Sequence, residues 1–289
     1  MKKRVLAAMM ACAMAAGLLS GCSSEPKNPG DSNEPVTTAA AGQTEAGDAT
    51  AAAQEESGPR IFHDYMTTDV DTINPHIYTM SVSGDVIART SLQLYRQYPN
   101  VEGTSFEYFP ELAEKEPEKA DEEGKVWRIK IRENAKWENG DAIDVDDVIY
   151  SFKMCLDPLM VNSRASQLAS DYITITKASD YSLQGNAGTV AWEDVGIKKA
   201  DDYTLKLQLD APVTAEDIKA HFNYVWTCLV HEPTYEACMS EDRSTNTYGS
   251  TREKYMSCGA FILDQWIAGS QFDMKKNPDF VLGDKIKLD

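Results

Sequence analysis

Histidine and cysteine are the side chains in this sequence best suited to acid–base, nucleophilic or metal chemistry. The chain has four histidines, His63, His76, His221 and His231. They are scattered, and none belongs to a Gly-x-Ser-x-Gly, His-Glu-x-x-His or phosphate-loop motif. Catalysis requires a positioned nucleophile or acid–base pair, so the pattern argues against an enzyme.

Six cysteines are present, one in the apolar N-terminal stretch, one at its end and four in the remaining chain: Cys12, Cys22, Cys155, Cys228, Cys238 and Cys258. Four cysteines allow three disulfide pairings in an exported protein. Our first candidate is a Cys228–Cys238 disulfide. The alternative, a zinc site formed by these two cysteines and His231, does not match the ligand spacing of standard zinc sites.

An acidic cluster, Asp141, Asp144, Asp146 and Asp147, has two interpretations. Carboxylates can bind a cation, but this cluster lacks the alternating ligands and the central Gly of a calcium loop. Alternatively, Asp144 caps a helix and the next two aspartates lie in its first turn, where the helix dipole favours negative charge. We predict the helix start.

The elements around this cluster follow from the residue pattern. Residues 127–131 alternate apolar and charged side chains, which predicts a strand with one buried face. Residues 139–141, Asn-Gly-Asp, are typical of a turn. The helix then begins at Asp144, with Ile143 and Val148 at the spacing of a hydrophobic staple.

The N-terminus has the pattern of an export signal. A basic start precedes an apolar core at 5–19. Leu-Ser-Gly-Cys then ends at Cys22 and resembles a lipobox, the bacterial signal for acylation of the cysteine and cleavage before it. We predict a lipoprotein signal peptide at 1–21, with cleavage by ordinary signal peptidase as the alternative. Acyl chains on Cys22 would anchor the protein in a membrane.

Residues 22–58 are rich in Ser, Ala, Thr, Gly and Glu and have few large apolar side chains. Such a composition cannot bury a core, so we predict a disordered tether. The formal net charge of the whole chain is −18. This acidic balance argues against nucleic acid or an anionic membrane surface as a direct partner.

Residues 127–153 closely resemble the signature region of the extracellular solute-binding proteins of family 5, receptors of ABC importers for oligopeptides, dipeptides and nickel. The matching features are the strand, Lys-Trp, a polar turn with Gly, the capped helix and Tyr-Ser-Phe. Four more segments resemble the family in the same order: DTINPH at 71–76, FPELAE at 109–114, VGIKKADDYTLKLQL at 195–209 and the hairpin at 257–280.

The resemblance implies an α/β chain with a type II periplasmic-binding-protein-like fold. Residues 59–83 and 191–289 would form an incomplete lobe I with a mixed sheet, and 84–190 an inserted α+β domain. The family's second lobe would be missing. We therefore expect weak or no solute binding by these 289 residues alone.

The resemblance also suggests which residues face a ligand. In the family, the segment after the Asn-Pro-His turn runs beside the ligand, and an aromatic residue near position 164 approaches it. The arginine here departs from that pattern. The candidate ligand-binding residues are Tyr78, Thr79, Met80, Ser81, Arg164, Tyr224 and Trp226. For the aromatic residues and Met80, packing in the interior is the alternative.

The function implied is that of a substrate-binding lipoprotein of an ABC importer, which takes peptide-like solutes outside the cell and delivers them to a membrane permease. It would be exported and lipid-anchored to the outer face of the cytoplasmic membrane, on the periplasmic side or the cell surface. This role requires no cofactor and no metal. The alternatives are an exported surface lipoprotein that is an enzyme acting on surface polymers, or an adhesin or sensor.

Overall fold

The computed structural model describes residues 58–160 and 162–288, all within the unit Glu56–Asp289. The predicted signal peptide at 1–21, the lipidation site Cys22 and the predicted tether up to residue 57 lie outside the described residues. These three expectations remain predictions.

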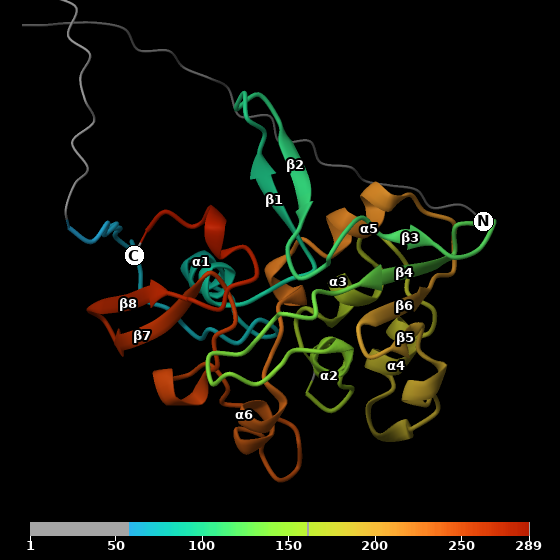
Figure 1. The fold of residues 1–289 in the computed structure, drawn as a ribbon. Helices are drawn as coiled ribbons and strands as arrows, with labels where there is room; N and C mark the ends of the chain where they lie inside the picture. Colours follow the sequence, from blue (N-terminus) through green and yellow to red (C-terminus); the bar gives the residue numbers. More distant parts are fainter. Residues whose placement is uncertain (1–57, 161, 289) are drawn as a thin grey trace, which may run out of the picture. The chain divides into compact units, whose positions relative to one another are not determined.

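The described part combines short helices with antiparallel strand pairs (Figure 1). The helices are α1 (Ser81–Thr90), α2 (Val145–Cys155), α3 (Ala165–Ser170), α4 (Ala178–Leu183), α5 (Ala215–His221) and α6 (Glu232–Ala237). The strands are β1 (Tyr95–Pro99), β2 (Phe106–Pro110), β3 (Glu118–Lys119), β4 (Val126–Lys130), β5 (Ile197–Asp201), β6 (Thr204–Gln208), β7 (Phe261–Ile267) and β8 (Gln271–Lys276).

The largest sheet has four strands in the order β3-β4-β6-β5. Alternation along β4 and β6 places apolar side chains on one face, as the sequence predicts. Trp127 pairs with Leu207 and Ile129 with Leu205, and all four are buried. The helix α2 packs against this apolar face next to β5 and β6. The strand prediction for 127–131 is therefore confirmed.

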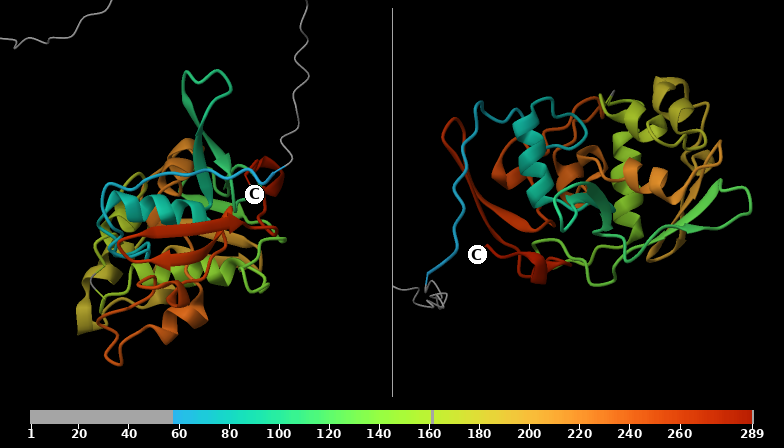
Figure 2. Two further views of the ribbon diagram at one scale, coloured as in Figure 1. Left: turned by 90° about the vertical axis from the view of Figure 1, so that its left-hand side faces the viewer. Right: turned by 90° about the horizontal axis from the view of Figure 1, so that it is seen from above.

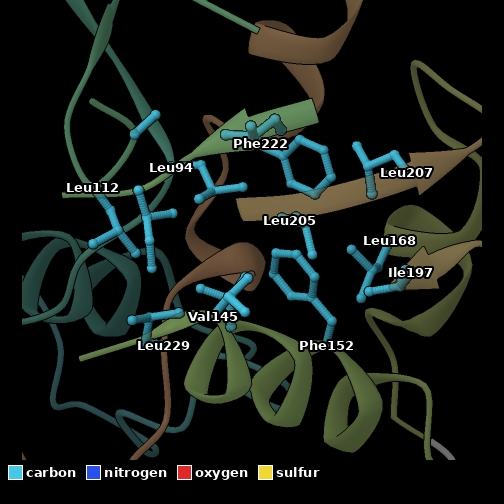
Figure 3. Packing of buried hydrophobic residues seen from close by; sticks show 14 of the residues in the cluster. Leu94, Leu112, Val145, Phe152, Leu168, Ile197, Leu205, Leu207, Phe222 and Leu229 are labelled. Atoms are coloured by element: carbon cyan, nitrogen blue, oxygen red, sulfur yellow. The ribbon is translucent and has the colours of Figure 1, made fainter. Parts of the chain in front are cut away.

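The core lies between this sheet and α2 (Figure 3). Phe152 of α2 stacks on Phe222, with ring centroids 5.4 Å apart and an interplanar angle of 17°. Leu205, Leu168 and Val145 belong to the same buried cluster. Burying a large apolar side chain contributes about 1.5–3 kcal/mol, so this packing holds α2 in place.

The start of α2 confirms the helix-cap interpretation of the acidic cluster. Asp144 accepts a hydrogen bond from the Asp146 backbone N–H (2.8 Å), and Asp147 accepts one from the Asp144 backbone N–H (3.0 Å). This is a capping box. Burial raises the pKa of Asp147 to about 6, against the opposing effect of its hydrogen bonds from the Asp144 backbone N–H and the Trp137 indole N–H.

The main sheet joins strands from both parts of the predicted domain division. The strands β3 and β4 belong to the predicted inserted domain at 84–190, whereas β5 and β6 belong to the predicted lobe I at 191–289. One buried cluster also spans both parts. The division into lobe I and an inserted domain remains a prediction.

Two hairpins flank this body. The hairpin β1–β2 projects away from it (Figure 1). The hairpin β7–β8 lies along α1, as the view from the side shows (Figure 2). The second hairpin is the one expected from the family-like segment at 257–280. The helix α1 therefore packs against β7. The segment that leads into α1 is the region where the sequence predicts ligand contacts.

Candidate functional site

Asp71 fixes the segment that leads into α1. Its carboxylate accepts hydrogen bonds from the Thr79 backbone N–H (2.8 Å), the Thr79 hydroxyl (2.6 Å) and the Ser83 hydroxyl (2.5 Å). It also accepts one from the Thr72 backbone N–H (2.9 Å). Partial burial alone would raise the pKa of Asp71, but these hydrogen bonds outweigh burial and lower the pKa to about 2. The residue is therefore ionised at neutral pH.

The chain just after Asp71 is pinned from the other side by Gly249. The Ile73 backbone N–H donates to the Gly249 carbonyl (2.9 Å), and the Thr72 hydroxyl donates to the same oxygen (3.1 Å). Gly249 has φ +69°, and a Cβ there would lie 2.6 Å from the Asn74 backbone nitrogen. Only glycine fits this approach without strain.

The Asn-Pro-His turn is buried and held by hydrogen bonds of Asn74 and His76, although Asn74 Nδ2 and His76 Nε2 have no partner. Asn74 Oδ1 accepts from the His76 backbone N–H (3.0 Å), and His76 Nδ1 lies 3.1 Å from the Tyr235 hydroxyl oxygen. Burial lowers the pKa of His76 to about 3, so the ring is neutral. Its role is to hold the turn.

Residues 77–81 connect the Asn-Pro-His turn to the start of α1. The Tyr78 backbone N–H donates to the Asn74 carbonyl (3.2 Å), and the Thr79 N–H is taken by Asp71. Met80 is extended, with φ −88° and ψ 136°, but it is the N-cap of α1, which begins at Ser81. The side chains of Thr79 and Ser81 are exposed and that of Met80 is half-buried. These three residues remain candidates for ligand contact.

Arg164 comes from the start of α3 and reaches this segment. Its Nη2 donates to the Tyr78 carbonyl (3.2 Å), and the guanidinium carbon lies 4.5 Å from the centroid of the Tyr78 ring. The centroid of the Trp226 ring lies 5.8 Å from the same carbon. A guanidinium within about 6 Å of two aromatic rings gains cation–π attraction from both. Arg164 is therefore held in one place.

The aromatic contacts continue beyond Trp226. Its ring stacks on Tyr224 with centroids 4.1 Å apart and an interplanar angle of 8°. Tyr224 in turn stacks on Tyr172, and the two hydroxyl oxygens are 2.6 Å apart. This hydrogen bond and burial raise the pKa of Tyr224 to about 12. We call the set Tyr78, Arg164, Trp226, Tyr224 and Tyr172 the aromatic cluster.

The structure thus brings together four of the seven candidate ligand residues through direct contacts: Tyr78, Arg164, Tyr224 and Trp226. The other three follow Tyr78 in the chain. Sequence reasoning missed Asp71 and Tyr172. Asp71 lies within the family-like segment at 71–76, so its position was a usable signal, whereas nothing in the local pattern distinguished Tyr172.

The predicted Cys228–Cys238 disulfide is not formed in the structure, where both cysteines are free. Cys228 is buried, and its thiol points to Gln93 Oε1 at 3.7 Å. Cys238 is only half-buried, at the C-cap of α6. The nine residues between them carry the chain from the buried Cys228 through α6 to Cys238.

His221 and His231 each contact a different neighbour and do not form a joint site. Burial lowers the pKa of His221 to about 4, and its Nε2 lies 3.1 Å from the Leu168 carbonyl oxygen. His231 Nδ1 lies 2.8 Å from the Thr234 hydroxyl oxygen, and burial lowers its pKa as well. Within residues 58–160 and 162–288, no three His, Cys, Asp or Glu side chains are grouped to hold a metal ion.

Residues 107–289 match the family model described as "Bacterial extracellular solute-binding proteins, family 5 Middle". The chain therefore belongs to family 5 of the bacterial extracellular solute-binding proteins. The match confirms the family resemblance seen in the sequence.

Named relatives support this assignment. The oligopeptide-binding protein OppA of Bacillus subtilis is 27% identical over 235 residues, which are 81% of this chain and 39% of OppA. The dipeptide-binding protein DppE of the same organism is 29% identical over 180 residues, 62% of this chain and 30% of DppE. The chain thus spans well under half the length of these relatives.

Solved structures confirm the type II periplasmic-binding-protein fold. Listeria monocytogenes OppA bound to peptide matches with a TM-score of 0.63 and 25% identity, over 75% of this chain and 38% of that protein. The substrate-binding domain of an oligopeptide ABC transporter from Bacillus anthracis matches with a TM-score of 0.66 and 22% identity, over 80% of this chain and 41% of that protein. The helices in the described part are all too short or too polar to cross a membrane.

Proposed function

We propose that this chain is a substrate-binding lipoprotein of an ABC importer and that it captures peptide-like solutes outside the cell for delivery to a permease. Family membership supports the binding role. The names of the relatives, oligopeptide-binding and dipeptide-binding proteins, support peptides as the solute class.

The observation that carries the proposal is the aromatic cluster. Tyr78, Arg164 and Trp226 were candidate ligand residues from three separate segments of the sequence, and Arg164 contacts the other two in the structure. Stacked aromatic rings next to a partly exposed segment suit the side chains of a peptide, because they offer large apolar contact area with few rotatable bonds.

The proposed mechanism is binding without covalent chemistry. The exposed residues Thr79 and Ser81 would contact the ligand from the body described above, while Asp71 and Gly249 hold the segment rigid. A rigid segment loses little conformational freedom when it binds, which favours affinity. In two-lobed receptors, closure over the ligand follows from tighter binding in the closed state.

Membrane attachment is proposed through acylation of Cys22, on the outer face of the cytoplasmic membrane. The test is metabolic labelling with a palmitate analogue in a bacterial host that expresses the whole chain. We expect label in the wild type and none in Cys22→Ser. The matched control is Cys12→Ser, which should keep the label because Cys12 would be removed with the signal peptide. Equal label in wild type and Cys22→Ser would exclude this anchor.

Peptide binding is best tested by a method that detects weak complexes. We would titrate the isotopically labelled protein with tri-alanine up to millimolar concentrations and follow backbone and indole N–H signals by NMR. We expect shifts at Thr79, Ser81 and the Trp226 indole, and loss of these shifts in Tyr224→Ala, which removes the stacking partner of Trp226.

The matched control is Tyr65→Ala, because Tyr65 is 84% exposed. This variant should bind tri-alanine as the wild type does. Shifts confined to residues far from the aromatic cluster, or no shifts with tri-alanine and with longer alanine peptides, would contradict the proposed peptide-binding role of these residues.

A further inference from the structure

Arg164 is half-buried and, within the described residues, forms no ion pair with a carboxylate; the same is true of Arg132, which donates to the Glu111 backbone carbonyl (2.8 Å). Arg96, Arg243 and Arg252 each form an ion pair with a glutamate. Within residues 58–160 and 162–288, the polar contact of Arg164 is the Tyr78 carbonyl, and its other contacts are aromatic rings.

Two buried N–H groups of these neighbouring side chains also lack an acceptor. Arg164 Nε and Trp226 Nε1 are both inaccessible to solvent and have no hydrogen-bond partner. An unsatisfied buried donor is costly, more so when it carries charge. An acceptor oxygen that reached these groups would therefore gain more than it would on an open surface. Reaching them requires a side chain of the aromatic cluster to move aside.

The remaining contacts explain why the cation stays in place without an anion. The Tyr78 and Trp226 rings hold the guanidinium by cation–π attraction. The Tyr78 carbonyl occupies one N–H of Nη2, which leaves other N–H groups of the fork unused. A planar fork of this kind matches a carboxylate in geometry as well as in charge.

From these observations we propose that Arg164, with the Trp226 indole N–H, is a specificity-determining site for a carboxylate on the ligand, so that peptides with an acidic side chain are preferred. The inference rests on the proposed peptide-binding function and adds the class of peptide. The partly exposed Arg164 lies beside the segment 77–81, where a bound peptide would place one of its side chains.

The experiment compares two peptides of equal size, Ala-Glu-Ala and Ala-Gln-Ala, by NMR titration of the whole chain. We expect the glutamate peptide to bind about tenfold more tightly. We also expect it to shift the Arg164 Nε–H and Trp226 indole signals, the latter assigned with Trp226→Phe. In Arg164→Gln the preference should disappear. The matched control Arg128→Gln, which removes the same charge from the exposed face of β4, should keep it.

The outcomes separate this inference from the proposed function. If both peptides bind the wild type equally, peptide binding stands and the carboxylate site is refuted. This comparison uses the wild type alone. If neither peptide binds, propionate and propionamide decide, because they differ only in carboxylate against amide. Shifts of the Arg164 Nε–H signal by propionate alone would then support the carboxylate site, and no shift would refute it.

Discussion

Replacing Asp71 by Asn should loosen the segment that leads into α1. The side chain keeps its size but loses its charge and one acceptor oxygen, while four donors converge on the native carboxylate. An amide nitrogen at one of the two oxygen positions would face the Thr79 N–H and hydroxyl or the Ser83 hydroxyl. At least one of these donors would then lose its partner.

The lowered pKa of Asp71 gives the magnitude. A pKa of about 2 against the ordinary value of 3.8 corresponds to roughly 2.4 kcal/mol of stabilisation if solvent played no part. Because the Asp71 side chain is exposed, screening reduces this to about 1 kcal/mol. The folded-state pKa is the lower one, so this stabilisation is present above pH 3.8 and is lost as the pH falls through 2.

The assay is urea unfolding of wild type and Asp71→Asn at pH 7 and at pH 3. We expect Asp71→Asn to be about 1 kcal/mol less stable at pH 7 and the difference to shrink by about half at pH 3. The control is Asp85→Asn on α1, because Asp85 is exposed and its carboxylate has no hydrogen bond in the described residues. Equal stability of wild type and Asp71→Asn at pH 7, or an unchanged difference at pH 3, would refute this reasoning.

Three further predictions concern residues that support the site. Glu111→Ala should cost about 3–5 kcal/mol in urea unfolding, because it leaves the half-buried Arg96 guanidinium without its partner. Gly249→Ala should cost about 2–5 kcal/mol in thermal unfolding, from the backbone clash and the left-handed φ together. Alkylation followed by peptide mass spectrometry should label Cys238 in the native protein. The three buried cysteines, whose thiol pKa burial raises, should react only after unfolding.

Each of these has a matched comparison. Glu118→Ala removes an exposed ion pair with Lys115 and should change stability little, so equal losses for the two glutamates would contradict the burial argument. Gly283→Ala meets no atom within 4 Å, and a loss as large as that of Gly249→Ala would point to a general effect. Resistance of Cys238 to alkylation together with Cys228 would favour a disulfide between them.

The sequence alone determined the local elements and the family. Alternation at 127–131 and the capping pattern at Asp144 are short-range features, set by side-chain direction along a strand and by hydrogen bonds within one turn. The order of family-like segments then indicated a solute-binding protein, which the family match confirms.

Tertiary structure decided which residues meet. Arg164, Tyr78 and Trp226 come from segments up to 148 residues apart in numbering, and only packing of α3 beside the Asn-Pro-His turn places them together. The role of Asp71 as a four-donor acceptor and the free state of Cys228 and Cys238 also depend on distances in space. Periodicity and spacing report what a side chain faces along its own element, whereas such contacts arise from how separate elements pack.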